Sequence, residues 1–198
     1  MGVQPWWLTV TEREPWPAAE RALLRAGQAG DRAALEQLVA PHERPLFGLC
    51  YGILGHAEDA EDAAQEALLR ALRALPRFQP GSAPFRTWLF RIAVNVCLNE
   101  KRDQRPTEPW DEERPAAGLE TASPAAIALR RLQMTEALRT LPPRHRAIFL
   151  LRVLEEWSLE EIGAAMGWNR IRVKNELSKA RRALAEWQAR QAAEGAEP

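Results

Sequence analysis

Apolar residues recur three or four positions apart through most of the chain, which is the spacing of one face of a helix. Residues 18–102 show none of the alternation that strands produce. Asp31 is a candidate N-cap, and Pro41 and Pro45 are expected to break or restart the helix that it starts. The N-terminal half is therefore predicted to be a set of helices. Their predicted ranges are 31–40, 45–54, 56–75 and 85–102.

The segment 157–187 is predicted to form a helix-turn-helix. Ser158 can cap the first helix in a capping box with Glu161, and Gly167 ends that helix. The second helix has one face that packs and an opposite face that is free to meet a partner. The packing face carries Val173, Leu177, Ala180, Leu184 and Trp187. The outward face carries Ile171, Lys174, Asn175, Ser178, Lys179 and Arg182.

Charge is unevenly distributed along the chain, although its formal net charge is zero. Residues 103–124 hold 6 acids and 2 bases, whereas residues 125–198 hold 9 acids and 13 bases. Six of those bases lie between Arg170 and Arg182, where Glu176 is the one acid. A basic helix of this kind suits the major groove of DNA, so we expect DNA as its partner. The alternative is a solvated basic helix that closes an ordinary bundle.

Two further helix faces carry candidate contacts. On the helix 56–75, polar groups surround one leucine, and this stripe alone is typical of a solvated face. On the helix 85–102, Arg and Asn lie in line beside aromatic residues, as single-stranded nucleic acid requires for phosphate contacts and base stacking. The alternative there is a buried Trp88 beside a merely solvated polar line. The stripe is Asp62, Gln65, Glu66, Leu69 and Arg73; the line is Thr87, Arg91, Asn95, Asn99 and Arg102, near Phe78 in an exposed loop over 77–84.

The acidic stretch 103–124 is rich in proline and is predicted to be a flexible linker. The predicted fold class is therefore all-α, with two small helical domains joined by this linker, the second containing the helix-turn-helix. A tail with Trp6, Trp7 and Trp16 precedes them. The predicted divisions are an N-terminal tail 1–17, a first domain 18–102, the linker 103–124, a second domain 125–190 and a C-terminal tail 191–198.

Cys50 and Cys97 lie far apart without a CxxC pair, and no histidine is spaced with them as metal ligands are. We expect two buried thiols, with no disulfide, metal or cofactor. An enzyme is not expected, because the sequence has no set of nucleophile, base and orienting residue and no phosphate-binding loop. The N-terminus has no signal-peptide pattern, and no run approaches the roughly 18 apolar residues of a membrane span. A cytoplasmic protein without membrane insertion is indicated.

Three stretches form an ordered set at characteristic separations: DAEDAAQEALLRAL, FRTWLFRIAVN, and LPPRHRAIFLLRVLEEWSLEEIGAAMGWNRIRVKNELSKARRAL. This set resembles bacterial RNA polymerase sigma factors of the extracytoplasmic-function (ECF) group. The resemblance covers residues 20–102 and 125–187, which leaves out the tail and most of the linker. It implies a factor that binds core RNA polymerase, recognises two promoter elements and promotes DNA melting for transcription initiation.

The resemblance also implies partners for each candidate surface. These are the clamp helices of the largest polymerase subunit, the flap of the second subunit, promoter DNA and an anti-sigma factor. The implied polymerase-binding residues are Asp62, Gln65, Glu66 and Leu69. Those for the unwound minus-ten element are Phe78, Trp88, Arg91, Asn95, Asn99 and Arg102. For the minus-thirty-five element, Lys174, Asn175, Ser178 and Lys179 would lie over bases and Arg170, Arg172 and Arg181 near phosphates.

The second helix of the helix-turn-helix departs from the family pattern at Ile171 and Arg172, where a Gly-Thr pair is usual, and at Glu176, where a base is frequent. An acid beside the DNA backbone is repelled unless it accepts a hydrogen bond, for example from the cytosine amino group. Two other classes stay open. A DNA-binding response regulator would need an α/β receiver domain, for which residues 18–102 show no strand pattern. A structural helical adaptor would not bind core polymerase.

Overall fold

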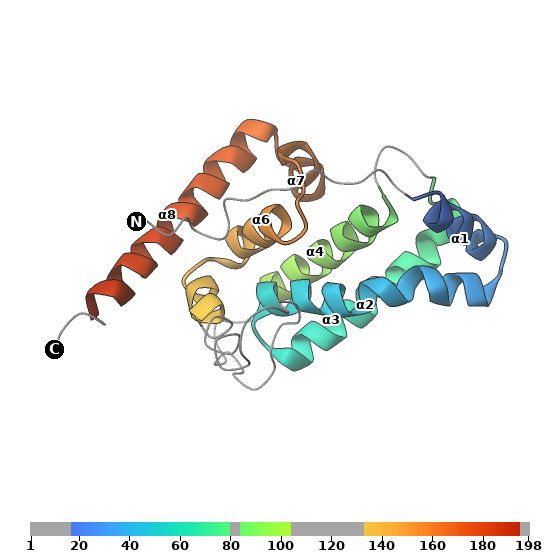
Figure 1. Ribbon diagram of the computed structural model, residues 1–198, viewed down its shortest axis with the longest axis horizontal. Coiled ribbons are helices and arrows are strands. Elements are labelled where there is room, and N and C mark those ends of the chain that lie inside the picture. The colour runs from blue at the N-terminus through green and yellow to red at the C-terminus, as the bar shows by residue number, and fades with distance from the viewer. Residues whose placement is uncertain (1–16, 80–83, 104–132, 195–198) are drawn as a thin grey trace.

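The computed structural model describes residues 17–79, 84–103 and 133–194, and every regular element in these ranges is helical (Figure 1). The prediction of an all-α fold is confirmed. The predicted linker and most of the two predicted tails lie outside the described residues. In chain order the elements are α1 (Ala18–Gln28), α2 (Arg32–Leu54), α3 (Ala57–Ala74), the 3₁₀ helix η2 (Leu75–Arg77), α4 (Phe85–Asp103), a short helix over 133–139, α6 (Pro143–Val153), α7 (Leu159–Met166) and α8 (Arg170–Glu194).

The N-terminal unit is built around α2, which packs against α1, α3 and α4. Asp31 caps α2 as predicted, because its side chain accepts a hydrogen bond from the Ala34 N–H at 3.1 Å. The helix ends at Gly55, whose φ of 84° lies in the left-handed region that glycine adopts without strain. The inward face of α3 consists of small side chains, which let α3 approach α2 and α4 closely. These are Ala60, Ala63, Ala64, Ala67 and Ala71.

The prediction that Pro41 and Pro45 break or restart the helix that Asp31 caps is wrong, because both lie inside the continuous helix α2. A proline inside a helix costs about 3 kcal/mol, since it removes one hydrogen bond and crowds the preceding turn. Leu38, Leu46 and Leu49 flank the prolines and are buried in the core. Burial of each such side chain contributes about 1.5–3 kcal/mol. Tertiary packing is therefore large enough to offset the local cost of two prolines.

The C-terminal unit contains the predicted helix-turn-helix, α7 and α8. Ser158 and Glu161 form both hydrogen bonds of the capping box, at 2.8 and 3.1 Å. Gly167 ends α7 with a φ of 67°, as its position in the sequence predicted. The turn also requires a glycine at position 163, because a Cβ there would lie 2.6 Å from the carbonyl oxygen of Trp168. The turn can therefore close tightly against α7.

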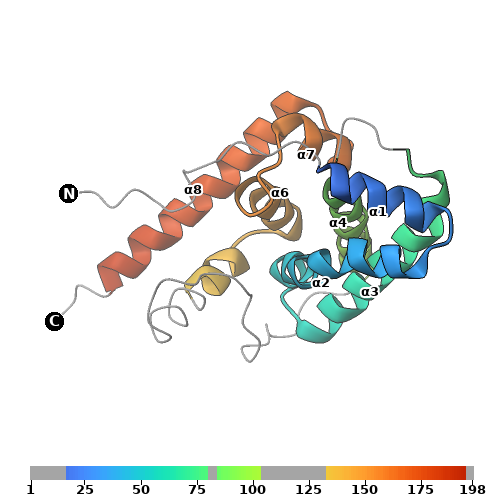
Figure 2. The same ribbon diagram turned by 45° about the vertical axis from the view of Figure 1, so that its right-hand side comes forward.

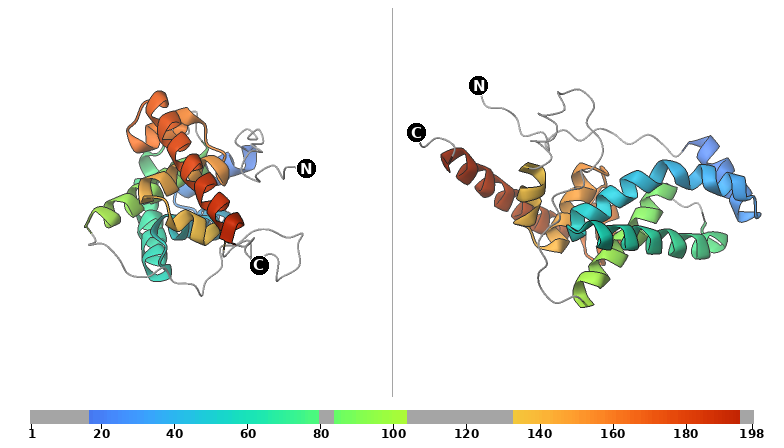
Figure 3. Two further views of the ribbon diagram at one scale, coloured as in Figure 1. Left: turned by 90° about the vertical axis from the view of Figure 1, so that its left-hand side faces the viewer. Right: turned by 90° about the horizontal axis from the view of Figure 1, so that it is seen from below.

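The two helical units lie directly against each other, with α6 on α2 and α7 on α4 (Figures 2 and 3). Leu150 of α6 lies so close to Gly52 that a Cβ at Gly52 would be 2.6 Å from Leu150 Cδ1. Arg146 spans the junction and donates from Nη1 to the carbonyl oxygen of Ile53 at 2.9 Å. Buried apolar residues of both units form one continuous cluster. The sequence predicted two domains but not this contact between them.

Cys50 and Cys97 are buried free thiols, as predicted. Among the described residues, no group of three or more His, Cys, Asp or Glu side chains is arranged to hold a metal ion. None of the described helices is both long enough and apolar enough to cross a membrane.

Candidate nucleic-acid interface

The basic helix α8 presents the two faces that its sequence predicted. Its apolar face packs against α6 and α7, with Val173, Leu177, Ala180 and Leu184 buried and Trp187 half-buried. Because one side of the helix is covered, the opposite side is left to solvent. The exposed residues on that side are Ile171, Lys174, Asn175, Ser178, Lys179 and Arg182. The C-terminal end of α8 projects away from the other helices (Figure 3).

The first arginines of α8 are held by neighbouring side chains. Asn169 caps the helix by accepting a hydrogen bond from the backbone N–H of Arg172 at 2.8 Å. The Arg172 guanidinium lies 4.2 Å from the centre of the Trp168 ring, a cation–π contact. Arg170 Nε lies 3.1 Å from Glu160 Oε1 of α7. The Arg172 guanidinium thus has a fixed direction beside the exposed side of α8, while that of Arg170 is paired with a carboxylate of α7.

Arg181, the third predicted phosphate contact, is half-buried rather than displayed on the surface. Its Nε is buried and has no hydrogen-bond partner among the described residues. A guanidinium carries five donors, so Arg181 can still offer others to a phosphate. Its role near DNA stays a prediction.

Glu176 is half-buried, unlike the exposed basic residues Lys174 and Lys179 on the same helix. Its Oε2 lies 2.7 Å from His145 Nε2 of α6, and its Oε1 accepts a hydrogen bond from Lys179 Nζ at 2.9 Å. The hydrogen bond from Lys179, and then that from His145, holds the pKa of the Glu176 carboxyl below its usual range. The partners of the Glu176 carboxylate are therefore side chains of the protein itself, whereas the sequence suggested a donor on DNA such as the cytosine amino group. The spacing to Lys179 is visible in the sequence, but the partner on α6 is not.

The exposed line on α4 is present as predicted for Arg91, Asn95 and Asn99. The prediction for Thr87 is wrong, because this side chain is 5% exposed and faces the core. Burial extends beyond one face of α4 and includes Phe90. Covering more than one face of α4 leaves a narrower polar line. The side chain of Arg102, the last predicted member, lies outside the described residues.

Phe78 is half-buried, which corrects the expectation of an exposed loop aromatic. Its ring stacks on that of Trp88, with centroids 4.3 Å apart and planes at 28°, and meets Phe85 edge-on. Gln28 fixes this turn by donating from Nε2 to the Phe78 carbonyl oxygen at 2.6 Å. Phe78 and Trp88 thus form an aromatic pair beside the polar line of α4, with residues 80–83 outside the described part.

The polar stripe on α3 faces solvent, with Asp62, Gln65 and Leu69 exposed. Glu66 is paired within the helix, because Arg70 Nε lies 2.6 Å from its Oε1. Leu69 is 47% exposed, and Leu72, which the sequence analysis did not select, is 41% exposed. Leu69 and Leu72 lie three positions apart on one helix face, so they form a small apolar patch bordered by polar groups, and such patches occur at protein–protein contacts. The stripe is therefore available to a partner.

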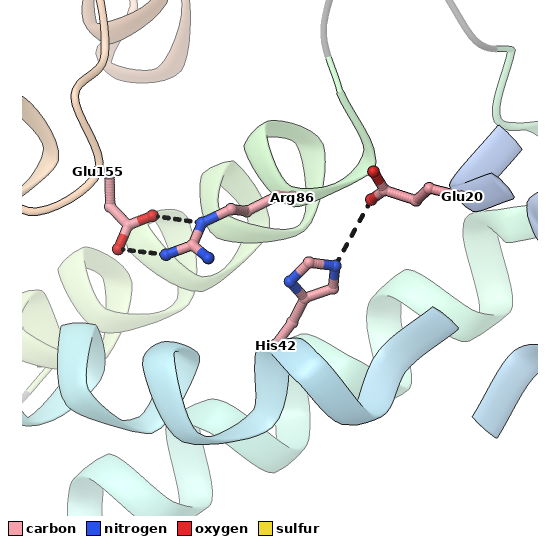
Figure 4. A network of polar contacts seen from close by, with 4 residues as sticks. All are labelled: Glu20, His42, Arg86 and Glu155. Carbon is pink, nitrogen blue, oxygen red and sulfur yellow. Dashed lines mark hydrogen bonds and ion pairs between the residues drawn. The ribbon is translucent and has the colours of Figure 1, made fainter. Parts of the chain in front are cut away.

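Two polar pairs lie close together at the junction of the two helical units, and one of them spans it (Figure 4). Arg86 of α4 donates from Nε and Nη2 to the carboxylate of Glu155, at 2.7 and 3.0 Å. His42 of α2 lies 3.6 Å from Glu20 of α1. Burial, and then the charge of Arg86, lowers the pKa of His42 to about 4. Sequence reasoning missed the pair that spans the junction because Arg86 and Glu155 are 69 positions apart.

Two regions of the chain match the families described as Sigma-70 region 2, over residues 38–107, and Sigma-70 region 4, over residues 131–184. The ECF RNA polymerase sigma factor SigG of Mycobacterium tuberculosis is 36% identical over a 170-residue alignment, which covers 73% of this chain and 46% of SigG. The chain thus spans less than half the length of that relative. SigM of the same organism is 34% identical over 169 residues, covering 84% of this chain and 83% of SigM.

Among solved structures, this chain is similar to CnrH in its complex with the cytosolic domain of CnrY. The TM-score is 0.64 at 26% sequence identity, and the match covers 86% of this chain and 97% of that one. The similarity therefore extends over both helical units.

Proposed function

Because the chain belongs to the ECF group of bacterial RNA polymerase sigma factors, we propose that it binds core RNA polymerase and directs it to promoters. In this function α8 recognises a minus-thirty-five element, and α4 captures and helps to melt a minus-ten element. The exposed basic side of α8, set in a well-capped helix-turn-helix, is the observation that carries the proposal. The chain acts as an initiation factor in the cytoplasm and catalyses no step of its own.

At the minus-thirty-five element, Lys174, Asn175, Ser178 and Lys179 read base edges in the major groove. Their exposure on one side of α8 supports this role. Arg170, Arg172 and Arg181 lie near the phosphates that flank those bases. The stacking of Arg172 on Trp168 supports such a contact, because a guanidinium with a fixed direction loses less freedom when it binds.

At the minus-ten element, Arg91, Asn95 and Asn99 hold the backbone of the unwound strand. Phe78 and Trp88 lie beside this line and offer ring faces to splayed bases, each such stack being worth about 1–3 kcal/mol. Since the two rings already stack on each other, a base must pack on their outer side or part them. Arg102 is a further minus-ten contact in this proposal.

Polymerase contacts come from both helical units. Asp62, Gln65, Glu66 and Leu69 meet the clamp helices of the largest subunit, with Leu69 as the apolar anchor of a polar rim. The C-terminal unit meets the flap of the second subunit. An anti-sigma factor is a further partner in this proposal, supported by the similarity to CnrH, whose structure includes the cytosolic domain of CnrY.

The two units must separate when both promoter elements are bound. Elements at positions minus thirty-five and minus ten lie about 25 base pairs apart, which is about 85 Å of duplex at about 3.4 Å per step. A compact chain of this length has a radius of gyration of only about 16 Å. Binding to core polymerase would therefore break the contacts of α6 with α2 and of Arg86 with Glu155.

The test is transcription reconstituted from core polymerase and the purified chain. It should yield promoter-dependent transcripts, and removal of basic residues from the exposed side of α8 should change which promoters are used. Arg190→Ala is the matched control, because Arg190 is an exposed base on the same helix outside the proposed reading residues.

A further inference from the structure

Glu176 is the one acid in the stretch 170–182, and both of its carboxylate oxygens are engaged within the protein. One oxygen contacts His145 of α6, and the other accepts from Lys179, three residues further along α8. The Glu176 side chain is 20% exposed, whereas that of Lys179 is 63% exposed. The Glu176 carboxylate therefore lies closer to the protein surface than to solvent, while the Lys179 side chain that it contacts extends into solvent.

We propose that Glu176 is a positioning residue for DNA recognition: it fixes the direction of Lys179 and the seating of α8 on α6, and does not itself contact DNA. This inference rests on the proposed function of α8 in reading the minus-thirty-five element. The negative charge of Glu176 alone would argue against any part in DNA binding.

The effect on Lys179 follows from the freedom of a lysine side chain. A four-carbon stem with a rotatable ammonium can reach phosphates on either side of a groove, and phosphate contacts carry no sequence information. An ammonium held by the Glu176 carboxylate samples fewer directions, so it can be aimed at a base edge such as guanine O6 or N7. Glu176 thus turns a general phosphate ligand into a selective contact.

The effect on α8 follows from the contact with His145, which lies in the first turn of α6. A carboxylate only accepts hydrogen bonds, so His145 Nε2 carries the hydrogen in this contact. The contact adds a polar link to the apolar seam between α6 and α8 and resists rotation of α8 about its axis. A small rotation would move every reading residue relative to the bases.

This role predicts two effects of opposite sign when Glu176 is removed. Loss of a negative charge near the phosphate backbone should strengthen binding to every sequence. Release of Lys179 should weaken the preference for one or two base pairs. If Glu176 only stabilised the fold, its removal would lower both general DNA binding and base-pair preference. If Glu176 itself read bases, its removal would lower the preference at base pairs other than those that Lys179 reads.

Selection from DNA randomised across the minus-thirty-five element, by core polymerase carrying the full chain, measures the preference at every position. Lys179→Ala should lose preference at one or two positions, and Glu176→Ala should lose about fivefold or more at the same positions. Binding of Glu176→Ala to unselected duplex should not fall. Glu176→Gln should keep an intermediate preference, because its amide oxygen can still accept from Lys179. Glu186→Gln, which removes the same charge elsewhere on α8, should leave the preference unchanged.

His145→Phe keeps a ring but removes the polar link, and it should weaken the preference at the same positions as Glu176→Ala. The inference is overturned if Glu176→Ala keeps the preference that Lys179→Ala loses, if it loses preference at other positions, or if Lys179→Ala changes nothing. A wild-type chain with no preference anywhere in the randomised region would overturn base reading by α8 as well. Thermal unfolding of each variant separates a lost contact from a lost fold, and Glu176→Gln carries the test if Glu176→Ala does not fold.

Discussion

The guanidinium of Arg86 and the carboxylate of Glu155 form a two-pronged ion pair between α4 and the turn that follows α6, at 2.7 and 3.0 Å. The Glu155 side chain is 5% exposed and that of Arg86 is 36% exposed. The pair therefore closes the junction of the two helical units from its partly buried side. Separation of the two units, which the proposed binding to both promoter elements requires, would have to break this pair.

Breaking this pair should destabilise the closed arrangement. Arg86→Leu leaves a buried carboxylate without its guanidinium, and we expect the free energy of unfolding to fall by about 1–2 kcal/mol, less than for a fully buried pair because Arg86 is partly solvated. Denaturant unfolding measures the change. The exchanged double variant, Arg86→Glu with Glu155→Arg, should recover part of the loss. If the double variant loses as much unfolding free energy as Arg86→Glu and Glu155→Arg lose together when made singly, the pair does not hold the units together.

His42 should make the protein less stable in mild acid. The unfolded chain binds a proton at His42 near the ordinary pKa of 6.5, whereas the folded chain binds it only near 4. The unfolded state therefore holds more protons between these values, and stability falls as pH drops through that window. The carboxylate of Glu20, 3.6 Å from His42, favours the protonated imidazole in the folded chain and so reduces this loss of stability. We expect a loss of about 1–2 kcal/mol between pH about 7 and about 5 that His42→Gln lacks. Equal pH slopes in unfolding experiments on the two proteins would contradict this assignment.

Core binding should depend on the stripe of α3. Leu69→Glu with Gln65→Ala should weaken binding to core polymerase by about tenfold or more, because an apolar anchor is replaced by a charge that must be desolvated. Competition against a labelled sigma factor measures the affinity, and circular dichroism checks that the helices persist. Leu154→Glu is a matched control, since Leu154 is 51% exposed, close to the 47% of Leu69, and lies in the other unit. Equal affinities of all three proteins would show that the stripe is only solvated.

Phe78 should matter most where DNA must be opened. Phe78→Ala removes one ring of the pair with Trp88, so open-complex formation on a duplex promoter should fall more than on a promoter with a pre-melted bubble. Permanganate footprinting of unpaired thymines gives the extent of opening. Phe47→Ala, which removes a half-buried ring from α2, controls for lost packing. Identical losses on both templates would mean that Phe78 has no part in melting.

Local features of the fold were predictable because their causes are local. The capping box at Ser158, the left-handed Gly167 and the two faces of α8 each depend on residues within a few positions of one another. The break predicted at Pro41 failed because packing from distant helices outweighs a local cost. The same distance hid the partner of Glu176, since His145 lies 31 positions away and only the packing of α6 on α8 brings them together.

The same distinction between local and distant causes applies to the candidate surfaces. Exposure of Lys174, Asn175 and Asn95 follows from helical periodicity, so the sequence predicted it correctly. Phe78 was expected in an exposed loop, but η2 turns its ring onto Trp88, a contact set by the end of one helix and the start of the next. Periodicity thus predicts which way a side chain points, and not what it meets.

If this chain gives core RNA polymerase its promoter specificity, transcription from a randomised template library should depend on it. Core polymerase transcribes a library of randomised DNA with and without the purified chain, and the transcripts are sequenced. We expect transcripts that require the chain and whose templates share two elements at a fixed spacing. Lys174→Ala should change only the upstream element and Asn95→Ala only the downstream one. Transcription that is not stimulated by the chain, or templates that share no spaced pair of elements, would contradict this role.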